Sequence, residues 1–235
     1  MSAGLRARRF RVPALIACEG VKSDNRPILL LLSTAAFLCC SVVAGAGLFR
    51  PLDVTILGLA QRGNSEVLDK VGLITSVVGG VEFIAMAAIA LAAGLFVQGQ
   101  RRLATRLLAA FLVTGLIEIV FKMVVPQAPV PGDALRGPDP SLLDISTPYP
   151  YPSGHTLRSV LLLGAIYLLW PNGPIRLAIV AFLVVSAASR LYLGTHWPSD
   201  VMGGALLGIA GLAWAFESYL PSAFSRQPGC MGRPP

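Results

Sequence analysis

The chain has 235 residues, of which 54% are hydrophobic and only 13% are charged, with a formal net charge of +7. A soluble domain carries nearer a quarter of charged residues, so the composition argues against a soluble enzyme. The basic N-terminal residues are typical of contact with anionic lipid beside a membrane span, and no nucleic-acid partner is expected.

Six apolar runs follow one another along the chain, and most approach the ~20 residues that span a bilayer core. They are Ile28 to Phe49, Val71 to Val97, Leu103 to Val125, Thr156 to Trp170, Leu177 to Ser189 and Val201 to Phe216. Because lipid leaves only helices and closed barrels as spanning structures, and no run alternates with period two, we expect an all-α bundle of six transmembrane helices. Residues 27–220 would form this domain, between a basic N-terminal segment (1–26) and a flexible tail (221–235).

The distribution of basic residues predicts the orientation of these helices. With an internal N-terminus, twelve of the 19 lysines and arginines fall on internal segments and seven on external ones. The positive-inside rule then places both termini in the cytoplasm and the protein in the inner or plasma membrane. A cleavable signal peptide ending near Ala44-Gly45-Ala46 is an alternative for the start of the chain, and it leaves the later helices in the same orientation.

Two external connections have distinct patterns. Apolar residues recur among polar ones within Arg50 to Lys70, which predicts a short amphipathic helix on the outer surface. The longest loop, Pro126 to Pro152, is rich in proline. A loop of this length between otherwise short connections is typical of a functional segment, and we expect a semi-rigid lid or site wall.

Both histidines of the chain lie in polar clusters at span ends on the expected external side. His155 opens the fourth span, and His196 precedes the sixth span by a few residues. Asp200 follows four residues after His196, with Pro198 suited to a first helical turn, so the carboxylate is expected on the face of the imidazole. It would accept the proton of one ring nitrogen and leave the other nitrogen free as a nucleophile.

Other polar residues of these clusters suit an anion. Ser153 and Gly154 stand at the start of an apolar helix, where backbone N–H groups bind anions. Arg190 can bind a tetrahedral oxyanion with two parallel hydrogen bonds. Lys122 can either reach a phosphate or pair with Glu118, four residues earlier. This set suits phosphoryl transfer, whereas two histidines and one aspartate among cations form a poor metal cage, so neither metal nor cofactor is expected.

At these residues the sequence resembles the type 2 phosphatidic acid phosphatase/haloperoxidase superfamily, whose signature is K-x6-R-P, then P-S-G-H, then S-R-x5-H-x3-D. The second motif is present from Pro152 to His155, and the third runs from Ser189 to Asp200. The resemblance implies that His196 forms a phosphohistidine, that Asp200 orients it, and that His155 protonates the leaving oxygen. It further implies that Lys122, Ser153, Gly154 and Arg190 bind the phosphate, without a metal.

The first motif departs from the family pattern, because Pro129 stands where the arginine is expected. A missing charge-assisted contact of this kind costs about tenfold in rate for each ~1.4 kcal/mol of lost transition-state stabilisation. Arg158, one turn after His155, is the first candidate to replace the missing arginine, and Arg136 in the proline-rich loop is the second.

The sequence therefore predicts a membrane lipid phosphatase acting on polyprenyl diphosphate, phosphatidate or phosphatidylglycerophosphate in the outer leaflet. A lipid phosphotransferase is the alternative within the same chemistry. A catalytically weakened family member that binds or transports lipid is the alternative from another class, favoured by Glu82 and Glu118 inside apolar runs. A haloperoxidase is expected to be soluble, which the spans contradict. The head group and the oligomeric state stay open.

Overall fold

The computed structural model describes residues 26–63, 65–136, 147–170 and 172–217, and these residues form helices and loops without a strand. The all-α prediction is thus confirmed for this part of the chain. The segment before residue 26 and the tail predicted for 221–235 lie outside the described residues. The elements are α1 (Arg26–Gly45), α2 (Arg50–Ala60), α3 (Glu66–Val78), α4 (Val81–Val97), α5 (Arg101–Val124), the 3-10 turn η2 (Gly132–Ala134), α6 (Gly154–Leu169), α7 (Gly173–Tyr192) and α8 (Pro198–Ala215).

Several helices are long and apolar enough to cross a membrane. Within the described ranges α1, α5 and α7 meet both criteria, and the bent pair α3–α4 adds a fourth span if it crosses as one unit. Helix α6 is apolar but has only 16 residues. Many large apolar side chains face outward, among them Val42, Leu112 and Leu177, each at least 65% exposed. Surfaces of this kind require lipid to cover them, so the protein is a membrane protein, and the count of six spans stays a prediction.

The second apolar run is not the continuous helix that the sequence predicted. It breaks into α3 and α4, which meet at an angle of 50°. The break falls at Gly79-Gly80, and glycine is the least helix-favouring residue after proline. A Cβ atom on Gly79 would lie 3.3 Å from Cδ2 of His155, so the absence of a side chain at Gly79 leaves room for that histidine.

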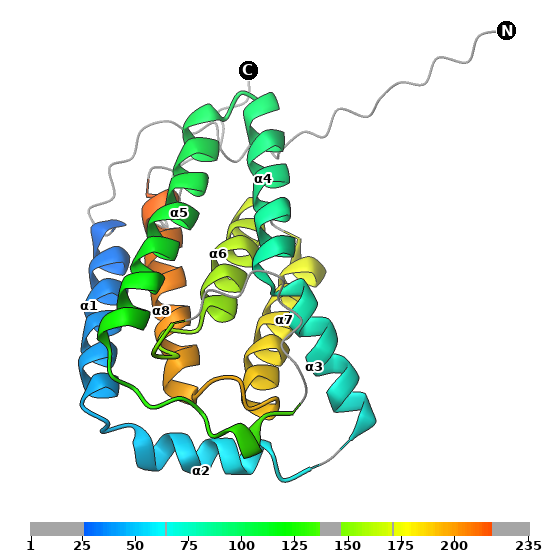
Figure 1. Ribbon diagram of the computed structural model, residues 1–235. Helices are drawn as coiled ribbons and strands as arrows, with labels where there is room; N and C mark the ends of the chain where they lie inside the picture. The colour runs from blue at the N-terminus through cyan, green and yellow to red at the C-terminus, as the bar shows by residue number, and fades with distance from the viewer. Residues whose placement is uncertain (1–25, 64, 137–146, 171, 218–235) are drawn as a thin grey trace, which may run out of the picture.

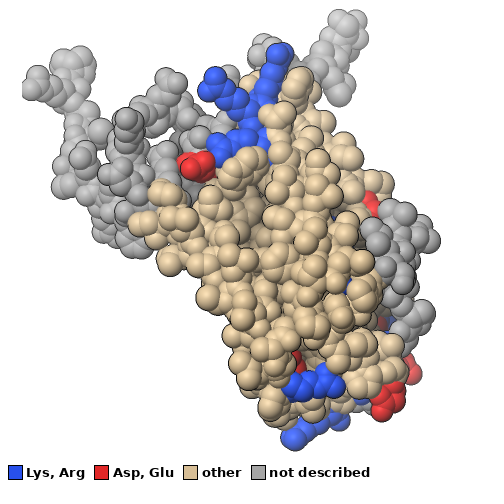
Figure 2. Space-filling view, turned by 60° about the vertical axis from the view of Figure 1, so that its left-hand side comes forward, with Lys and Arg blue, Asp and Glu red and all other residues tan. Residues whose placement is uncertain are grey.

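All the connections that carry the predicted polar clusters meet at one end of the bundle. Figure 1 shows α2 lying across this end, beside the last turn of α7 and the first turn of α8, while α5 ends and α6 begins further into the bundle. Figure 2 shows lysine and arginine side chains at both ends of the molecule, separated on this face by a broad surface without charged residues. That pattern is typical of a protein whose middle lies in hydrocarbon.

Helices α6 and α8 pack closely because α8 presents glycines to α6. A Cβ atom on Gly208 would stand 2.9 Å from the carbonyl oxygen of Leu157, and one on Gly204 would collide with the carbonyl oxygen of Ser153. Small residues at such positions let two backbones approach, which is how many membrane helices associate. The approach brings the starts of α6 and α8, and hence both histidines, to one place.

Helix α2 is the surface helix that the sequence predicted between Arg50 and Lys70. It buries Asp53 and Leu57 against the bundle and leaves Leu52, Val54 and Leu59 at least half exposed. The apolar face therefore points away from the bundle, while a carboxylate faces inward. We expect the outward face to rest on lipid headgroups and acyl chains.

Candidate active site

The turn between α7 and α8 places His196. Gly194 adopts φ of 70°, a conformation that residues with a side chain rarely take, and a Cβ there would collide with the carbonyl oxygen of Ala134. The N–H and hydroxyl of Thr195 then donate to the carbonyl oxygen of Arg190 at 3.1 and 3.2 Å. The chain consequently reverses within a few residues, and His196 reaches the cavity described below.

His196 and Asp200 contact each other at the start of α8. Nδ1 of His196 lies 3.3 Å from Oδ2 of Asp200, and the same oxygen accepts the backbone N–H of Trp197 at 2.9 Å. Asp200 is fully buried, whereas 13% of the His196 side chain is exposed. The spacing of four residues had suggested that His196 and Asp200 share one face of a helix. Instead, His196 precedes α8, and the Asp200 carboxylate reaches back to it from the first turn of the helix. The arrangement favours the tautomer with the proton on Nδ1, which makes Nε2 the ring nitrogen that carries the lone pair.

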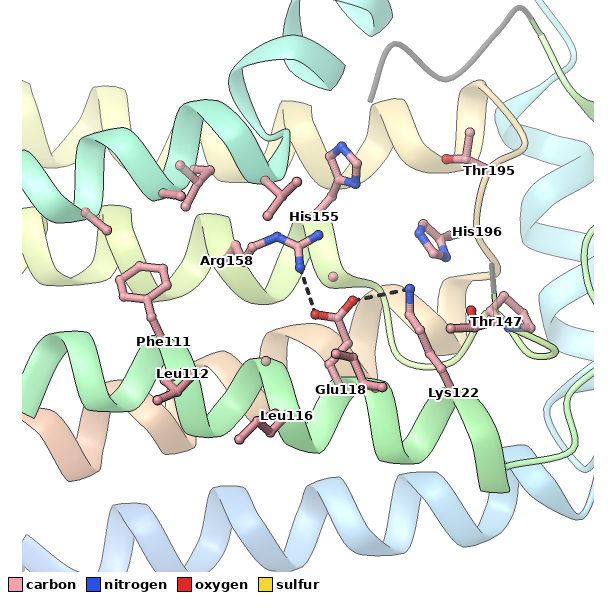
Figure 3. A pocket seen from close by; sticks show the side chains of 18 of the residues that line it. Phe111, Leu112, Leu116, Glu118, Lys122, Thr147, His155, Arg158, Thr195 and His196 are labelled. Atoms are coloured by element: carbon pink, nitrogen blue, oxygen red, sulfur yellow. Dashed lines mark hydrogen bonds and ion pairs between the residues drawn. The ribbon is translucent and has the colours of Figure 1, made fainter. Parts of the chain in front are cut away.

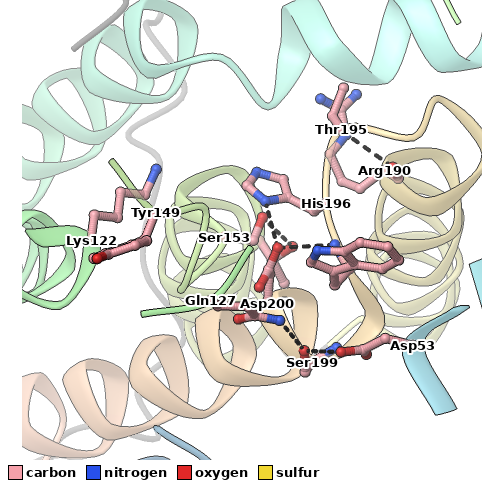
Figure 4. A network of polar contacts seen from close by, with 12 residues as sticks. Asp53, Lys122, Gln127, Tyr149, Ser153, Arg190, Thr195, His196, Ser199 and Asp200 are labelled. Carbon is pink, nitrogen blue, oxygen red and sulfur yellow. Dashed lines mark hydrogen bonds and ion pairs between the residues drawn. The ribbon is translucent and has the colours of Figure 1, made fainter. Parts of the chain in front are cut away.

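A second carboxylate, which the sequence analysis missed, holds the start of α8. Asp53 of α2 accepts the N–H of Ser199 at 3.0 Å and its hydroxyl at 2.7 Å. Nε2 of Gln127 donates to the same hydroxyl at 2.8 Å (Figure 4). Burial raises the pKa of the Asp53 carboxyl above its ordinary value, and the hydrogen bonds from Ser199 oppose that shift. An acidic residue on the inner face of an otherwise apolar helix was the sequence signal for this contact.

Trp197 fixes the same turn from the other side. Its side chain is almost fully buried, and Nε1 donates to the carbonyl oxygen of Ala128 at 2.8 Å. The guanidinium of Arg50, at the start of α2, lies 4.4 Å from the centre of the indole ring. The proline-rich loop and α2 thus both hold the residue that follows His196.

The start of α6 lies directly beside Asp200. The N–H of Ser153, the residue before the helix, donates to the carbonyl oxygen of Asp200 at 2.9 Å. Ser153 is fully buried, and His155 is 8% exposed. The start of α6, with Gly154 and His155, therefore lines the same cavity as His196, and a helix start of this kind attracts anions.

A cavity of about 870 Å³ joins the predicted site to the apolar middle of the bundle. Its polar end is lined by Lys122, Gly154, His155, Arg158 and His196. Its apolar part lies between α4 and α5, with Ile84, Ala88, Phe111, Leu112 and Leu116 among the walls. Figure 3 shows the polar side chains at one end and Phe111 and Leu112 at the other. The shape suits a molecule with a charged head and an apolar chain.

One buried carboxylate pairs with both cations of this cavity. Oε1 of Glu118 lies 3.2 Å from Nζ of Lys122, and Oε2 lies 2.8 Å from Nη1 of Arg158. A Cβ on Gly154 would collide with the Glu118 carboxylate, so only glycine fits there. These ion pairs account for one of the two intramembrane carboxylates that favoured a transport protein.

Two predicted residues lie away from the cavity wall. Arg190 is 1% exposed, and its guanidinium bonds to the hydroxyl of Ser76 and, at 3.4 Å, to the carbonyl oxygen of Gly72, both on α3. Arg136 donates to the carbonyl oxygen of Gln61 at 2.8 Å, and its guanidinium lies 4.8 Å from the ring centre of Tyr192. Arg136 is thus not among the residues that line the cavity, and these contacts connect its loop to the end of α2 and to α7.

Of the other predicted residues, some line the cavity and some lie behind its wall. Pro129, which stands in place of the arginine, lines the cavity, and so does Arg158. Ser153 and Asp200 lie behind the cavity wall. Asp200 contacts His196, and Ser153 directly precedes α6, whose first residues line the cavity. Among the described residues, no three histidine, cysteine, aspartate or glutamate side chains gather to hold a metal ion.

The chain is similar to two proteins that are named as phosphatases. A segment of 79 residues is 44% identical to an undecaprenyl-diphosphatase of Sulfolobus acidocaldarius and covers 32% of this chain and 37% of that protein. The chain thus spans little more than a third of that relative's length. A crystal structure of a transmembrane PAP2-type phosphatidylglycerolphosphate phosphatase from Bacillus subtilis matches 85% of this chain and 99% of its own, with a TM-score of 0.66 and 21% identity. The likeness to that structure shows a shared fold.

The family resemblance seen in the motifs is confirmed by a family model. That model, described as the PAP2 superfamily, matches residues 103–222. The matched region is more than half of the chain, and it contains Lys122, both histidines and Asp200. The chain therefore belongs to the PAP2 superfamily.

Proposed function

We propose that this protein is an integral membrane lipid phosphatase that removes a terminal phosphate from a lipid phosphomonoester or diphosphate. The observation that carries the proposal is the position of His196. Its imidazole is oriented by Asp200 at 3.3 Å and lines a cavity with cations at one end and apolar walls at the other. The two relatives named above are phosphatases of lipid substrates, which supports the same class of reaction here.

The reaction begins with Nε2 of His196 as the nucleophile. Asp200 accepts a hydrogen bond from Nδ1–H of His196 and stabilises the positive charge that develops on the ring. Nε2 forms a bond to phosphorus, the bond from phosphorus to the lipid oxygen breaks, and His155 donates a proton to that oxygen. Water then attacks the phosphohistidine while His155 takes one of its protons. Inorganic phosphate leaves, and both histidines return to their starting forms.

Phosphate binding is assigned to the cations and amides at the polar end. Lys122 and Gly154 line the cavity beside His196, and we assign to them the equatorial oxygens of the transferred phosphoryl group, while Arg158 lines the cavity further in. Ser153 supports the start of α6 behind them. The phosphate contact proposed for Arg190 would come from the same guanidinium whose Nη2 bonds to the hydroxyl of Ser76 and the carbonyl oxygen of Gly72.

We further propose six spans, formed by α1, the α3–α4 pair and α5 to α8. Both termini would then be cytoplasmic, and the site would face the extracytoplasmic surface. Arg101 and Arg102 at the start of α5 support this orientation, because they lie at the end of that helix opposite Lys122. Cysteine labelling of exposed positions at each end of α5, in intact cells, tests it. Labelling of the Arg102 end from outside the cell would contradict the orientation.

A substrate panel tests the proposed activity. The full chain, purified in detergent, should release inorganic phosphate from polyprenyl diphosphate, phosphatidate or phosphatidylglycerophosphate with EDTA present. His196→Ala should abolish release, and Arg102→Gln, which changes an exposed arginine far from the site, should not. No release from any lipid of the panel would sink the proposal. Transfer of labelled phosphate to an added alcohol faster than to water would instead identify a phosphotransferase.

A further inference from the structure

The order of groups along the cavity bears on the kind of lipid that it accepts. Figure 3 shows His196 and Lys122 at one end, Arg158 further in, and Phe111 and Leu112 beyond it. If a bound lipid has its reacting phosphorus at His196 and its chain along Phe111, part of the lipid lies beside Arg158. The atoms beside Arg158 are those of the leaving group, the part of the lipid that is next to the bond that breaks.

The charge at this position is suited to an anion. The Arg158 side chain is 22% exposed, and its ion pair is with Glu118. Glu118 also pairs with Lys122, so one carboxylate serves two cations and leaves one positive charge in excess. A second phosphate would neutralise that charge with charge-assisted hydrogen bonds. The ester-linked carbon of a glycerol or prenyl group has no charge to offer there.

The backbone near Arg158 supports the same ligand. Nη2 of Arg158 lies 2.6 Å from the place that a Cβ on Gly154 would occupy. The guanidinium therefore lies beside the first residue of α6, together with the Glu118 carboxylate, at a helix start whose dipole favours negative charge. A cation and a helix start thus lie side by side, between the histidines and the apolar walls.

We propose that Arg158 binds the phosphate that stays on the lipid, and that the preferred substrate is a lipid diphosphate. This inference rests on the phosphatase function proposed above. Nε2 of His196 bonds to the terminal phosphorus, and the bond from that phosphorus to the bridging oxygen breaks. The bridging oxygen keeps the electron pair, takes the proton of His155 and leaves as part of a lipid monophosphate, whose phosphate is paired with Arg158. Water then releases inorganic phosphate from His196.

The test compares two substrates that differ by one phosphate. Farnesyl diphosphate and farnesyl monophosphate are hydrolysed by the full chain in detergent with EDTA, and kcat/KM is measured for each. The variants are Arg158→Gln, Arg158→Lys and the control Arg102→Gln. Arg158→Gln leaves Glu118 paired with Lys122 at 3.2 Å, so it strands no buried charge and the fold should persist.

Selectivity is the decisive quantity. The ratio of kcat/KM for the diphosphate to that for the monophosphate should fall about 30-fold in Arg158→Gln, because a charge-assisted contact to one substrate only is lost. Arg158→Lys should keep part of the ratio, and Arg102→Gln should keep all of it. Inhibition by inorganic diphosphate should weaken in Arg158→Gln more than inhibition by inorganic phosphate.

The outcomes separate the two proposals. An equal fall for both substrates would overturn the inference, since Arg158 would then serve the transferred phosphate or the fold. An unchanged ratio would overturn it as well. Hydrolysis of neither substrate by the wild-type chain, with none across the lipid panel, would refute the phosphatase function itself.

Discussion

Asp53 and Ser199 connect a surface helix to the turn that carries His196 and Asp200. The Asp53 carboxylate accepts both the N–H and the hydroxyl of Ser199, at 3.0 and 2.7 Å, and both residues are buried. Ser199 precedes Asp200 by one residue, so a helix lying across the end of the bundle fixes the first turn of α8. We therefore consider Asp53 a positioning residue for the His196–Asp200 pair.

Replacing Asp53 should weaken both stability and catalysis. Asp53→Ala leaves the Ser199 N–H and hydroxyl without their buried acceptor, which should lower the free energy of unfolding by about 2 kcal/mol. A looser first turn of α8 should lower kcat at least about tenfold, with a smaller effect on KM. Asp53→Asn keeps one acceptor and should be intermediate. Thermal unfolding in detergent and steady-state kinetics measure both effects, and full stability with full activity in Asp53→Ala would refute this role. Asp133→Ala, at an exposed carboxylate, is the control.

Glu118 should weaken anion binding, because its carboxylate stands between the two cations of the cavity. Glu118→Gln removes one negative charge beside the phosphate site and keeps the side-chain size. The inhibition constant for vanadate, a phosphate mimic, should fall about tenfold. Glu118→Gln should also lower thermal stability, since Lys122 and Arg158 lose their shared partner. An unchanged or higher inhibition constant would show that the carboxylate does not oppose the ligand.

The apolar part of the cavity should hold the lipid chain. Gly115 lines it, and a Cβ there would meet no atom within 4 Å. Gly115→Phe should therefore fill the cavity without straining α5. We expect kcat/KM for a long-chain lipid substrate to fall roughly tenfold, a cost of ~1.4 kcal/mol. Hydrolysis of p-nitrophenyl phosphate, which has no chain, is the internal comparison. Equal losses on both substrates would place the lipid chain elsewhere.

The close packing of α6 on α8 predicts a contrast between two glycines. Gly204→Ala drives a methyl group into the carbonyl oxygen of Ser153 and should cost about 2 kcal/mol or more of stability. Gly94, in α4, has open space around it, and Gly94→Ala should be neutral or stabilising by up to ~1 kcal/mol. Melting temperatures of the two variants in the same detergent decide the point. Similar melting temperatures would mean that α6 and α8 can move apart without a loss of stability.

Much of the site was predictable because its chemistry lies in short motifs. His155, His196 and Asp200 are placed at span ends by apolar runs that the sequence shows directly, and the helix starts beside them follow from Pro198 and Gly154. The pairing of Lys122 with Glu118 followed from their spacing of four. Local patterns of this kind survive folding because neighbours in sequence stay neighbours in the helix.

Contacts between distant segments were not predictable from one sequence. Nothing near Ser199 signals that Asp53, 146 residues earlier, will cap it. Arg136 and Arg158 were equal in charge, and only the fold turns Arg136 onto Tyr192 and Arg158 into the cavity. The break at Gly79-Gly80 was visible as two glycines, but its 50° bend depends on the packing of α3 against α7.

Detection of phosphate on His196 tests the account most directly. The wild-type chain is mixed with lipid substrate, quenched in alkali within milliseconds and digested, and the peptide containing His196 is examined by mass spectrometry. The account predicts phosphate on His196, more of it in His155→Ala, where attack by water is slowed, and none in His196→Ala. Rapid turnover with no phosphate on His196 at any time, or with phosphate on another residue, would contradict it.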